Sequence, residues 1–523
     1  MSLVATPTAP AALAQAQELD RRGDARSVDL YYQAAVQSPI APQAGPVADA
    51  GEPQSGQVYR QALAGLIDAG QRYGRLDPRR QLIVVDGGTR VIPIRYLGFA
   101  WRPDDFSRLA SAEGQTTRDI AHHYATPGVG LPLVGERIAA CSQETFFRPW
   151  QPFAVTAVLR PVGDPSAATA PGDYVLEFYN PLVFDAVVGN GVSCPLARDL
   201  TAPLATIVNE APRQYLRGFT APSDTSVQPQ LVLVEPYQRG KIPVVFIHGL
   251  YSDPITWVDM ANELRAQRDL YDQYQFWTFR YPTGSDVLAS AAALRHQLQL
   301  VRETFDCRRD DPAMDDMVLV GHSLGGLLSK MQVTTSYDLL WREVAWGPFD
   351  ALRAPPDVQL KLAQGFFFEP VPTVKRVIFI GTPHGGSGMA RRLAGRIGSA
   401  LVNVGAEQNA EFHQLLDDNP DLFKPYLRRE RPTSVALLDP DSPLLAGLAR
   451  MPVNRATHLH SIVGTGGNNL LGESGDGLVS VSSAQHYGDS ALFVPAKHEK
   501  LHRHPASINE VARILRLHAS AAP

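Results

Sequence analysis

The chain has 523 residues, of which 44% are hydrophobic and 19% are charged, and its formal net charge is −5. This is the composition of a globular protein with two or three domains, and its mildly acidic balance gives no general attraction for nucleic acid or anionic membranes. No run approaches 18 apolar residues and the first residues lack a basic region followed by an apolar core, so neither a transmembrane helix nor a signal peptide is expected.

The first 75 residues are expected to form a helical segment and a linker. Residues 12–37 are rich in Ala, Gln, Glu and Arg and are predicted to be helical, with a break at Gly23. Residues 39–56 are rich in Pro, Gly and Ala, which is typical of a linker, and a further helix is predicted over 58–73.

A β-rich domain is expected over residues 76–230, where short apolar runs are separated by proline and glycine turns. One run alternates in the manner of a half-buried strand, with apolar residues at Phe153, Val155, Ala157 and Leu159. His122 and His123 are candidate site residues by type alone, and a surface or structural pair is the favoured interpretation. A pair between Cys141 and Cys194 stays open.

Residues 231–523 alternate strand-like and helix-like segments, which is typical of a mostly parallel sheet with helices on both faces. The expected strands have the sequences LVLVEPY (231–237), IPVVFIHG, YQFWTFRYP, MVLV, VKRVIFIGTPHGGS from Val374, HLHSIVG ending at Gly464 and ALFVPA ending at Ala496. A final helix is expected from about Ala506, because Ile508, Val511 and Ile514 share one helical face.

The most informative motif is Gly321-His322-Ser323-Leu324-Gly325, which follows an apolar strand and precedes an apolar pattern at helical spacing. A strand that enters a helix through Gly-x-Ser-x-Gly holds its serine in a sharp, strained turn. The glycines two positions away on either side avoid collision with the backbone. Ser323 is therefore the candidate nucleophile.

A nucleophilic serine of this kind needs a base and an acid, which follow it along the chain in the order Ser, Asp or Glu, His. Asp476 is the candidate acid, because it lies between two glycines in a loop after the HLHSIVG strand; Asp439 and Asp441 are its rivals. His498 is the candidate base, because it directly follows the last strand, and His502 is the second choice.

An oxyanion hole would combine the amide after the nucleophile with an amide from the loop after an early strand. These positions are Leu324 and Leu250, the second of which lies in the His248-Gly249-Leu250-Tyr251 turn. The residues expected to line the pocket are His248, Gly249, Tyr251, His322 and His384. Three histidines near the C-terminus have no carboxylate or cysteine at metal-ligand spacing, so no metal and no cofactor are expected.

Four segments, IHGLYSDPITW, GHSLGG, GTPHGGS and GDGLVSVSSA, together with the terminal HEKLHRHP loop, resemble bacterial lipases and esterases of the α/β-hydrolase superfamily. They are also similar to the hydrolase domain of inositol-deacylase lipases. The resemblance covers about residues 231–520 and implies an α/β-hydrolase fold. It implies that Ser323, Asp476 and His498 occupy the family's catalytic positions, and that His384 lies near the pocket outside them.

The chain departs from small lipases by its N-terminal half and by insertions near residues 333–370 and 388–435. These insertions lie where caps and lids are found, and either a mobile lid or a packed subdomain fits them. The first contains Trp341, Trp346 and three consecutive phenylalanines; an apolar and basic stretch, 389–404, belongs to the second.

The expected function is hydrolysis of carboxylic esters, with an ester or lipid-like small molecule as the partner and no nucleic acid. Two alternatives stay open: acyl transfer or thioester cleavage by the same residues, and a hydrolase-like scaffold that binds without catalysis. Contact with a lipid surface, a cytoplasmic or cell-envelope location and the oligomeric state also stay open.

Overall fold

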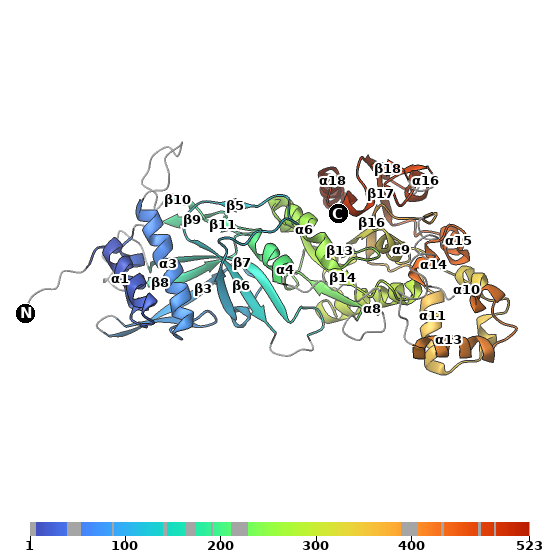
Figure 1. The fold of residues 1–523 in the computed structure, drawn as a ribbon, viewed down its shortest axis with the longest axis horizontal. Coiled ribbons are helices and arrows are strands. Elements are labelled where there is room, and N and C mark those ends of the chain that lie inside the picture. The colour runs from blue at the N-terminus through green and yellow to red at the C-terminus, as the bar shows by residue number, and fades with distance from the viewer. Residues whose placement is uncertain are drawn as a thin grey trace, which may run out of the picture. The chain divides into compact units, whose positions relative to one another are not determined.

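The computed structural model describes residues 7–38, 54–85, 88–139, 144–162, 174–189, 192–210, 228–388, 406–429, 433–468, 472–485 and 488–521. The chain divides into two compact units, Met1–Ala211 and Pro212–Pro523 (Figure 1). Cys141 and the stretch 389–404 lie outside the described residues. None of the described helices is both long and apolar enough to cross a lipid bilayer.

In the part of the first unit that the structure describes, three helices precede the sheet and a fourth follows it: α1 (Ala9–Arg21), α2 (Ser27–Val36), α3 (Gln54–Arg72) and α4 (Ala202–Glu210). The predicted break at Gly23 is confirmed, since this residue lies between α1 and α2 with a φ of 74°. The third helix begins four residues before the predicted position 58 and ends one before 73.

Seven described strands of this unit form one large sheet in the order β1-β2-β3-β8-β7-β6-β4. Their bounds are β1 (Leu76–Asp77), β2 (Gln81–Val85), β3 (Thr89–Leu97), β4 (Arg108–Ser111), β6 (Leu131–Ile138), β7 (Trp150–Pro161) and β8 (Tyr174–Tyr179). Shorter strands form two pairs: β5 (Ala125–Thr126) with β11 (Arg198–Asp199), and β9 (Ala186–Gly189) with β10 (Val192–Pro195). A 3₁₀ turn, η1 (Pro103–Asp105), lies between β3 and β4.

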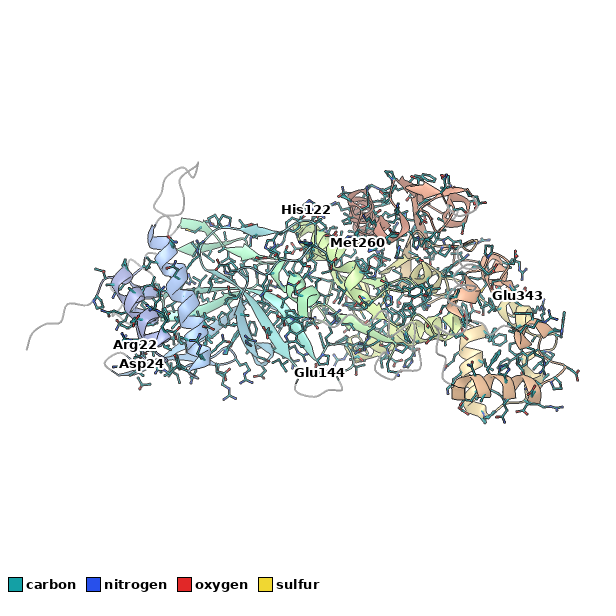
Figure 2. The ribbon with its side chains drawn as sticks, viewed as in Figure 1. Arg22, Asp24, His122, Glu144, Met260 and Glu343 are labelled. Carbon is teal, nitrogen blue, oxygen red and sulfur yellow. The ribbon has the colours of Figure 1, made fainter. Side chains whose placement is uncertain are left out.

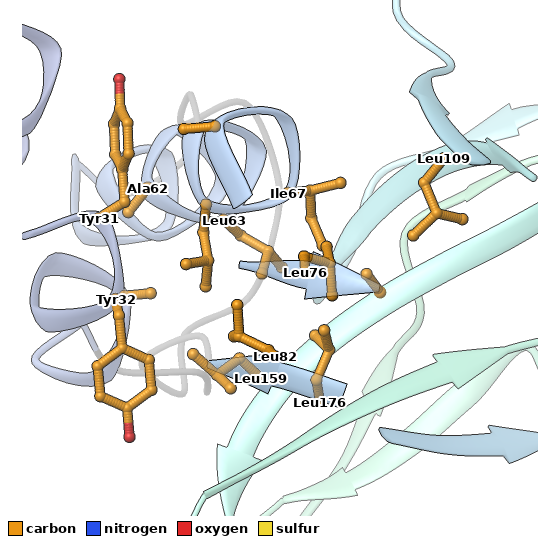
Figure 3. Packing of buried hydrophobic residues seen from close by; sticks show 14 of the residues in the cluster. Tyr31, Tyr32, Ala62, Leu63, Ile67, Leu76, Leu82, Leu109, Leu159 and Leu176 are labelled. Atoms are coloured by element: carbon orange, nitrogen blue, oxygen red, sulfur yellow. The ribbon is translucent and has the colours of Figure 1, made fainter. Parts of the chain in front are cut away.

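The helices and the sheet of the first unit share one hydrophobic core. Leu63 and Ile67 of α3 and Tyr31 of α2 belong to the same buried cluster as Leu82 and Leu159 of the strands (Figure 3). The spacing of Leu63 and Ile67 places both on one helical face, and that face is the one buried. The domain boundaries predicted at residues 75 and 230 stay predictions.

The prediction that the run from Phe153 to Leu159 is a half-buried strand is wrong, because β7 is buried on both faces. Phe153, Val155, Ala157 and Leu159 belong to the core under the helices. The alternate residue Val158 packs on the opposite face with Leu196 and other residues of the β9–β11 region. The smaller intervening residues therefore pack against a second layer instead of facing water.

His122 and His123 are both exposed residues of the first unit, and Figure 2 labels His122. The His123 Nε2 lies 2.8 Å from Asp199 Oδ2, which connects this loop to β11. This contact fits the favoured interpretation of a surface pair.

Seven described strands of the second unit form one sheet in the order β12-β14-β13-β15-β16-β17-β20, and β18 (Gly467–Asn468) pairs separately with β19 (Ser474–Gly475). Their bounds are β12 (Gln230–Leu233), β13 (Ile242–Ile247), β14 (Tyr274–Arg280), β15 (Met317–His322), β16 (Val374–Ile380), β17 (His458–Gly464) and β20 (Ser490–Val494). Neighbouring strands are parallel, except that β12 runs antiparallel to β14. This confirms the predicted mostly parallel sheet.

Helices cover both faces of this sheet (Figure 1). The helices α6 (Val258–Arg265), α7 (Arg268–Gln273) and α18 (Pro505–Ala521) bury apolar residues with Phe246, Val320 and Ile380 on one face. The helices α8 (Val287–Phe305) and α9 (Leu324–Lys330) lie on the other. The final helix begins at Pro505, one residue before the predicted position, because proline is tolerated in the first turn.

The second unit has further described elements outside the sheet and the helices on its faces. They are η2 (Pro254–Trp257), η3 (Pro312–Asp315), α10 (Leu339–Val344), η4 (Phe349–Ala351), α11 (Pro356–Phe366), α13 (Ala406–Asp418), η5 (Pro425–Arg428), α14 (Ser434–Leu437), α15 (Pro443–Arg450), β18 (Gly467–Asn468), β19 (Ser474–Gly475), α16 (Val481–Ala484) and α17 (His498–Leu501).

The described part of the two insertions packs together around aromatic rings. Trp341 of α10 is buried, and its ring lies 4.9 Å from that of Phe349 and 5.9 Å from that of Phe423, between ring centroids. A β-bridge between Ala345 and Phe423 connects the two insertions. Trp346, by contrast, is 71% exposed. A lid that moves stays a prediction.

Candidate active site

Ser323 lies in the sharp turn between β15 and α9, with φ 55° and ψ −123°. A serine seldom adopts this conformation, so the surrounding structure must hold it there. The Ser323 N–H donates to the Ile380 carbonyl of β16 at 2.9 Å. A Cβ added at Gly325 would lie 2.2 Å from the Ile247 carbonyl oxygen, and one at Gly321 would lie 2.6 Å from the Gly325 oxygen. Glycine is therefore required at both positions.

His498 connects the serine to a carboxylate. It is the first residue of α17, just after β20, and its Nε2 lies 2.9 Å from Ser323 Oγ. Its Nδ1 lies 2.7 Å from Asp476 Oδ2. Since a carboxylate accepts, Nδ1 carries the proton and Nε2 is left to accept from the hydroxyl. Asp476, Ser323 and His498 are 2%, 8% and 7% exposed, so this chain of hydrogen bonds is largely shielded from water.

Asp476 is held by its own loop. Its Oδ1 accepts from the backbone N–H groups of Leu478 at 2.9 Å and Val479 at 2.8 Å. The intervening Gly477 has a φ of 95°, which favours glycine. The carboxylate thus has one oxygen fixed by its loop while the other faces His498, which restricts the rotation of the acid relative to the imidazole.

Two glycines that end neighbouring strands leave room for the acid and base. A Cβ at Gly464, the last residue of β17, would lie 2.5 Å from Asp476 Cβ. A Cβ at Gly381, after β16, would lie 3.2 Å from Asp476 Oδ2 and 3.4 Å from His498 Nδ1. Neither glycine was among the predicted site residues, although a glycine at the end of a buried strand is a signal that could have found them.

The loop after β13 lies against the serine. A Cβ at Gly249 would come within 2.9 Å of Ser323 Cβ, so only glycine lets this backbone approach. Leu250 follows it, and Tyr251 has a φ of 55°, which turns the chain sharply. Leu324, the second candidate oxyanion residue, is fully buried at the start of α9. The structure therefore brings the Leu250 loop to the turn that contains Leu324.

Tyr281, which follows β14, supports this loop and was not among the predicted site residues. Its buried hydroxyl donates to the His248 carbonyl at 2.8 Å. The rings of Tyr281 and His248 stack with centroids 4.5 Å apart and an interplanar angle of 20°. His248 in turn contacts the Gly249 carbonyl through Nδ1 at 3.1 Å. The phenol thus fixes the backbone just before Leu250.

The alternative base, His502, and the alternative acids, Asp439 and Asp441, contact other residues. His502 Nε2 lies 2.9 Å from Thr256 Oγ1, and the His502 ring packs against Trp257. Asp439 accepts from the backbone N–H of Asp441 at 2.9 Å, and Asp441 is exposed.

His384 and His322 also lie near these loops. The half-buried ring of His384 packs edge-to-face on Phe379 at 4.6 Å, and its backbone N–H donates to the Ser483 carbonyl at 3.0 Å. The buried ring of His322 lies between those of His498 and His502, with centroid distances of 4.8 and 4.7 Å.

Burial keeps the surrounding histidines neutral. It lowers the pKa of His502 to about 3 and that of His248 to about 4. Burial, together with the neighbouring His502 and His498, holds the pKa of His322 well below its usual value. At neutral pH the nearby imidazoles of His322 and His502 are therefore uncharged and do not oppose a positive charge on His498. Among the described residues, no group of three or more His, Cys, Asp or Glu side chains is arranged to hold a metal ion.

Residues 244–504 match the alpha/beta hydrolase family. The second unit, with its parallel sheet and its serine between β15 and α9, therefore belongs to that family, and the predicted fold class is confirmed. A comparison with curated proteins gives no match.

Solved structures that are similar to part of the chain include three bacterial proteins. Bacillus licheniformis lipase BlEst2 in its mature form is 18% identical, with 53% of this chain and 93% of that chain covered and a TM-score of 0.31. Staphylococcus hyicus lipase is 12% identical (55% and 100% covered, TM-score 0.33). EstA from Clostridium botulinum is also 12% identical (60% and 97% covered, TM-score 0.33).

Proposed function

We propose that the protein is a serine hydrolase that cleaves carboxylic esters with Ser323 as nucleophile, His498 as base and Asp476 as acid. The observation that carries this proposal is that one buried imidazole contacts both the hydroxyl, at 2.9 Å, and the carboxylate, at 2.7 Å. A serine hydroxyl is a weak nucleophile until a base removes its proton, and an imidazole that donates to a carboxylate is oriented for that transfer.

The first half of the reaction forms an acyl-enzyme. As Ser323 Oγ attacks the ester carbonyl carbon, its proton passes to His498 Nε2, and the carbonyl oxygen takes the negative charge. Asp476 stays ionised and stabilises the imidazolium. His498 then gives the proton to the departing alkoxide, so the C–O bond breaks and the alcohol leaves.

The second half releases the acid. A water molecule gives a proton to His498 Nε2 while its oxygen attacks the acyl carbon, and the bond to Ser323 Oγ breaks as that oxygen recovers the proton. The amides of Leu250 and Leu324 are the proposed donors to the oxyanion in both halves. The close approach of the Gly249 backbone to Ser323 supports this assignment.

The proposed substrate is an ester with an acyl chain, and its length is the property that the insertions would set. Their aromatic residues Trp341, Phe349 and Phe423 pack together within the same unit, and we propose that they act as an apolar cap. A panel of p-nitrophenyl esters from acetyl to long acyl chains, run with and without detergent, measures this preference. Thioesters and alcohol acceptors added to the same panel show whether water is the acceptor that the site prefers.

The proposal is tested by labelling and by substitution of the serine. A fluorophosphonate should modify Ser323, and Ser323→Ala should lower kcat for a short p-nitrophenyl ester by at least about 10⁴-fold while the protein stays folded. Ser520→Ala, which removes an exposed serine of α18, is the matched control and should keep both labelling and turnover. An unlabelled wild-type protein without esterase activity would instead indicate a binding scaffold.

A further inference from the structure

The backbone of His498 is held from two sides by the loops that contain the other two proposed catalytic residues. Its N–H donates to the Asp476 carbonyl at 3.0 Å. Its carbonyl lies 3.1 Å from Nε2 of His322, the residue directly before Ser323. The base is therefore attached by its side chain and by its main chain to both the acid loop and the turn with the serine.

The contact with the carbonyl defines the state of His322. A carbonyl oxygen can only accept, so His322 Nε2 carries the hydrogen and Nδ1 has a lone pair. That Nδ1 is buried, has no hydrogen-bond partner among the described residues, and faces the close approach of Gly249, where an added Cβ would lie 3.2 Å away. The imidazole thus serves as a single donor, directed at His498.

We propose that His322 is a positioning residue that holds His498 at bonding distance from Ser323, an inference that rests on the proposed function. Ser323 and His322 are consecutive, and each contacts His498, one at the ring and the other at the main chain. A shift of the His498 main chain away from the serine must therefore lengthen the His322 bond as well.

The need for such a contact follows from where His498 lies. It begins the short helix α17, directly after the loop that leaves β20, the last strand in the sheet order, while Ser323 follows β15, three strands away. A displacement of about 1 Å between reacting groups can cost about 100-fold in rate. A hydrogen bond from the serine's own neighbour fixes that separation locally, without relying on the intervening strands.

Three substitutions of His322 test this role. Glutamine places an amide nitrogen near the position of the imidazole Nε2, asparagine carries the same amide on a shorter side chain, and leucine has no donor. We expect His322→Leu and His322→Asn to lower kcat by about 10- to 100-fold with KM within about twofold, and His322→Gln to stay within about threefold of wild type. Turnover is divided by the fraction of sites that a fluorophosphonate labels, so loss of folded protein does not enter the result.

The outcomes separate this inference from the proposed function. If wild-type turnover depends on Ser323 but His322→Leu keeps the wild-type kcat, only the role of His322 is overturned. Equal losses in the glutamine and leucine variants, or a glutamine variant that fails to fold, also overturn it, because the imidazole would then supply packing and not a hydrogen bond. If Ser323→Ala keeps its activity, the proposed function itself is refuted.

Discussion

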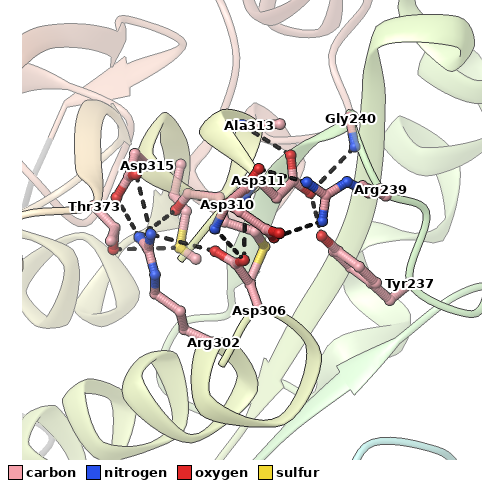
Figure 4. Close-up of polar contacts among 12 residues, drawn as sticks. Tyr237, Arg239, Gly240, Arg302, Asp306, Asp310, Asp311, Ala313, Asp315 and Thr373 are labelled. Atoms are coloured by element: carbon pink, nitrogen blue, oxygen red, sulfur yellow. Dashed lines mark hydrogen bonds and ion pairs between the residues drawn. The ribbon is translucent and has the colours of Figure 1, made fainter. Parts of the chain in front are cut away.

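Two polar clusters among the described residues lie at opposite edges of the sheet of the second unit, one at the carboxyl edge, where strands end, and one at the amino edge, where they begin. At the carboxyl edge, where β13, β15, β16, β17 and β20 end, lies the candidate site with Ser323, Asp476 and His498. At the amino edge, before β13, β15 and β16 begin, lies an aspartate–arginine cluster. We define this cluster as Tyr237, Arg239, Arg302, Asp306, Asp310, Asp311 and Asp315 (Figure 4).

The amino-edge cluster is rich in charge, and its carboxylates are already bound. Asp306 Oδ1 accepts from the N–H groups of Asp310 and Asp311, and Oδ2 lies 3.3 Å from Arg302. Asp311 accepts from Tyr237, Gly240 and Ala313, and Asp315 pairs with Arg302. A cavity of about 440 Å³ beside the cluster is lined in part by Arg302, Asp306 and Asp315.

The carboxyl edge has fewer charges but a directed chain of proton donors and acceptors. One carboxylate contacts one imidazole, which contacts one hydroxyl on a strained backbone, and the neighbouring imidazoles are neutral. Paired charges stabilise a folded structure, whereas catalysis needs a group whose proton can be transferred. Active groups in parallel sheets lie at the carboxyl ends of strands, which fits this assignment.

The largest expected effect at the carboxyl edge is that of the base. His498→Ala should lower kcat for a p-nitrophenyl ester by about 10⁴- to 10⁶-fold, because the hydroxyl loses its proton acceptor. His502→Gln, in the neighbouring loop, should stay within about tenfold, since His502 contacts Thr256 instead. A larger loss of kcat in the His502 variant than in the His498 variant would indicate that His502 is the base.

The next largest loss of kcat is expected for Asp476→Asn. An amide at this position favours the wrong tautomer of His498, and the expected loss in kcat is about 10⁴-fold with little change in melting temperature. Steady-state kinetics and calorimetry on the same sample measure both quantities. A change below about threefold would redirect the search to Asp439 or Asp441.

A fall in pH should destabilise the contacts at the carboxyl edge before it destabilises those at the amino edge. His248 and His502 have pKa values of about 4 and 3 in the fold, whereas an unfolded histidine has a pKa of about 6.5. Below about pH 6.5 the unfolded chain therefore binds more protons, and the free energy of unfolding falls by up to about 1.4 kcal/mol per pH unit for each histidine.

Urea unfolding at pH 7, 6 and 5 measures this slope, and His502→Gln should reduce it. The hydrogen bond from Arg302 lowers the pKa of Asp315 from its usual value, so that ion pair is retained down to a lower pH. A free energy of unfolding that stays constant from pH 7 to 5 would contradict the prediction.

Asp306→Asn should separate stability from activity. It removes the charge that faces Arg302 in the amino-edge cluster and should lower the free energy of unfolding by about 1–3 kcal/mol. Turnover per labelled site should stay within about twofold, because the cluster lies at the opposite edge of the sheet. A loss of kcat comparable to that of Asp476→Asn would contradict the assignment of stability to the amino edge and of activity to the carboxyl edge.

The smallest expected effect belongs to Tyr281→Phe. This change keeps the stacking on His248 but removes the hydrogen bond to its carbonyl, which should lower kcat by about 2- to 10-fold through the loop that precedes Leu250. A comparison of kcat and KM measures it. An effect on KM alone would mean that the loop binds substrate and does not stabilise the oxyanion.

Much of the second unit could be predicted from local patterns. The strand β16 begins at Val374, as predicted, and β17 spans the predicted run that ends at Gly464, because buried parallel strands need continuous apolar residues. The turn at Ser323 was likewise recognisable, since the glycines on either side are required by backbone contacts within a few residues and across one neighbouring strand.

The sequence by itself determined the class of fold and the position of the serine, since both depend on short-range spacing. Only the tertiary structure decided that His498, and not His502, contacts Ser323, because the two histidines are four residues apart while the serine is 175 residues from His498. It also decided that β7 is buried on both faces, that Tyr281 contacts His248 and that His322 contacts His498. Such contacts depend on strand order and register, which bring together side chains that no local pattern connects.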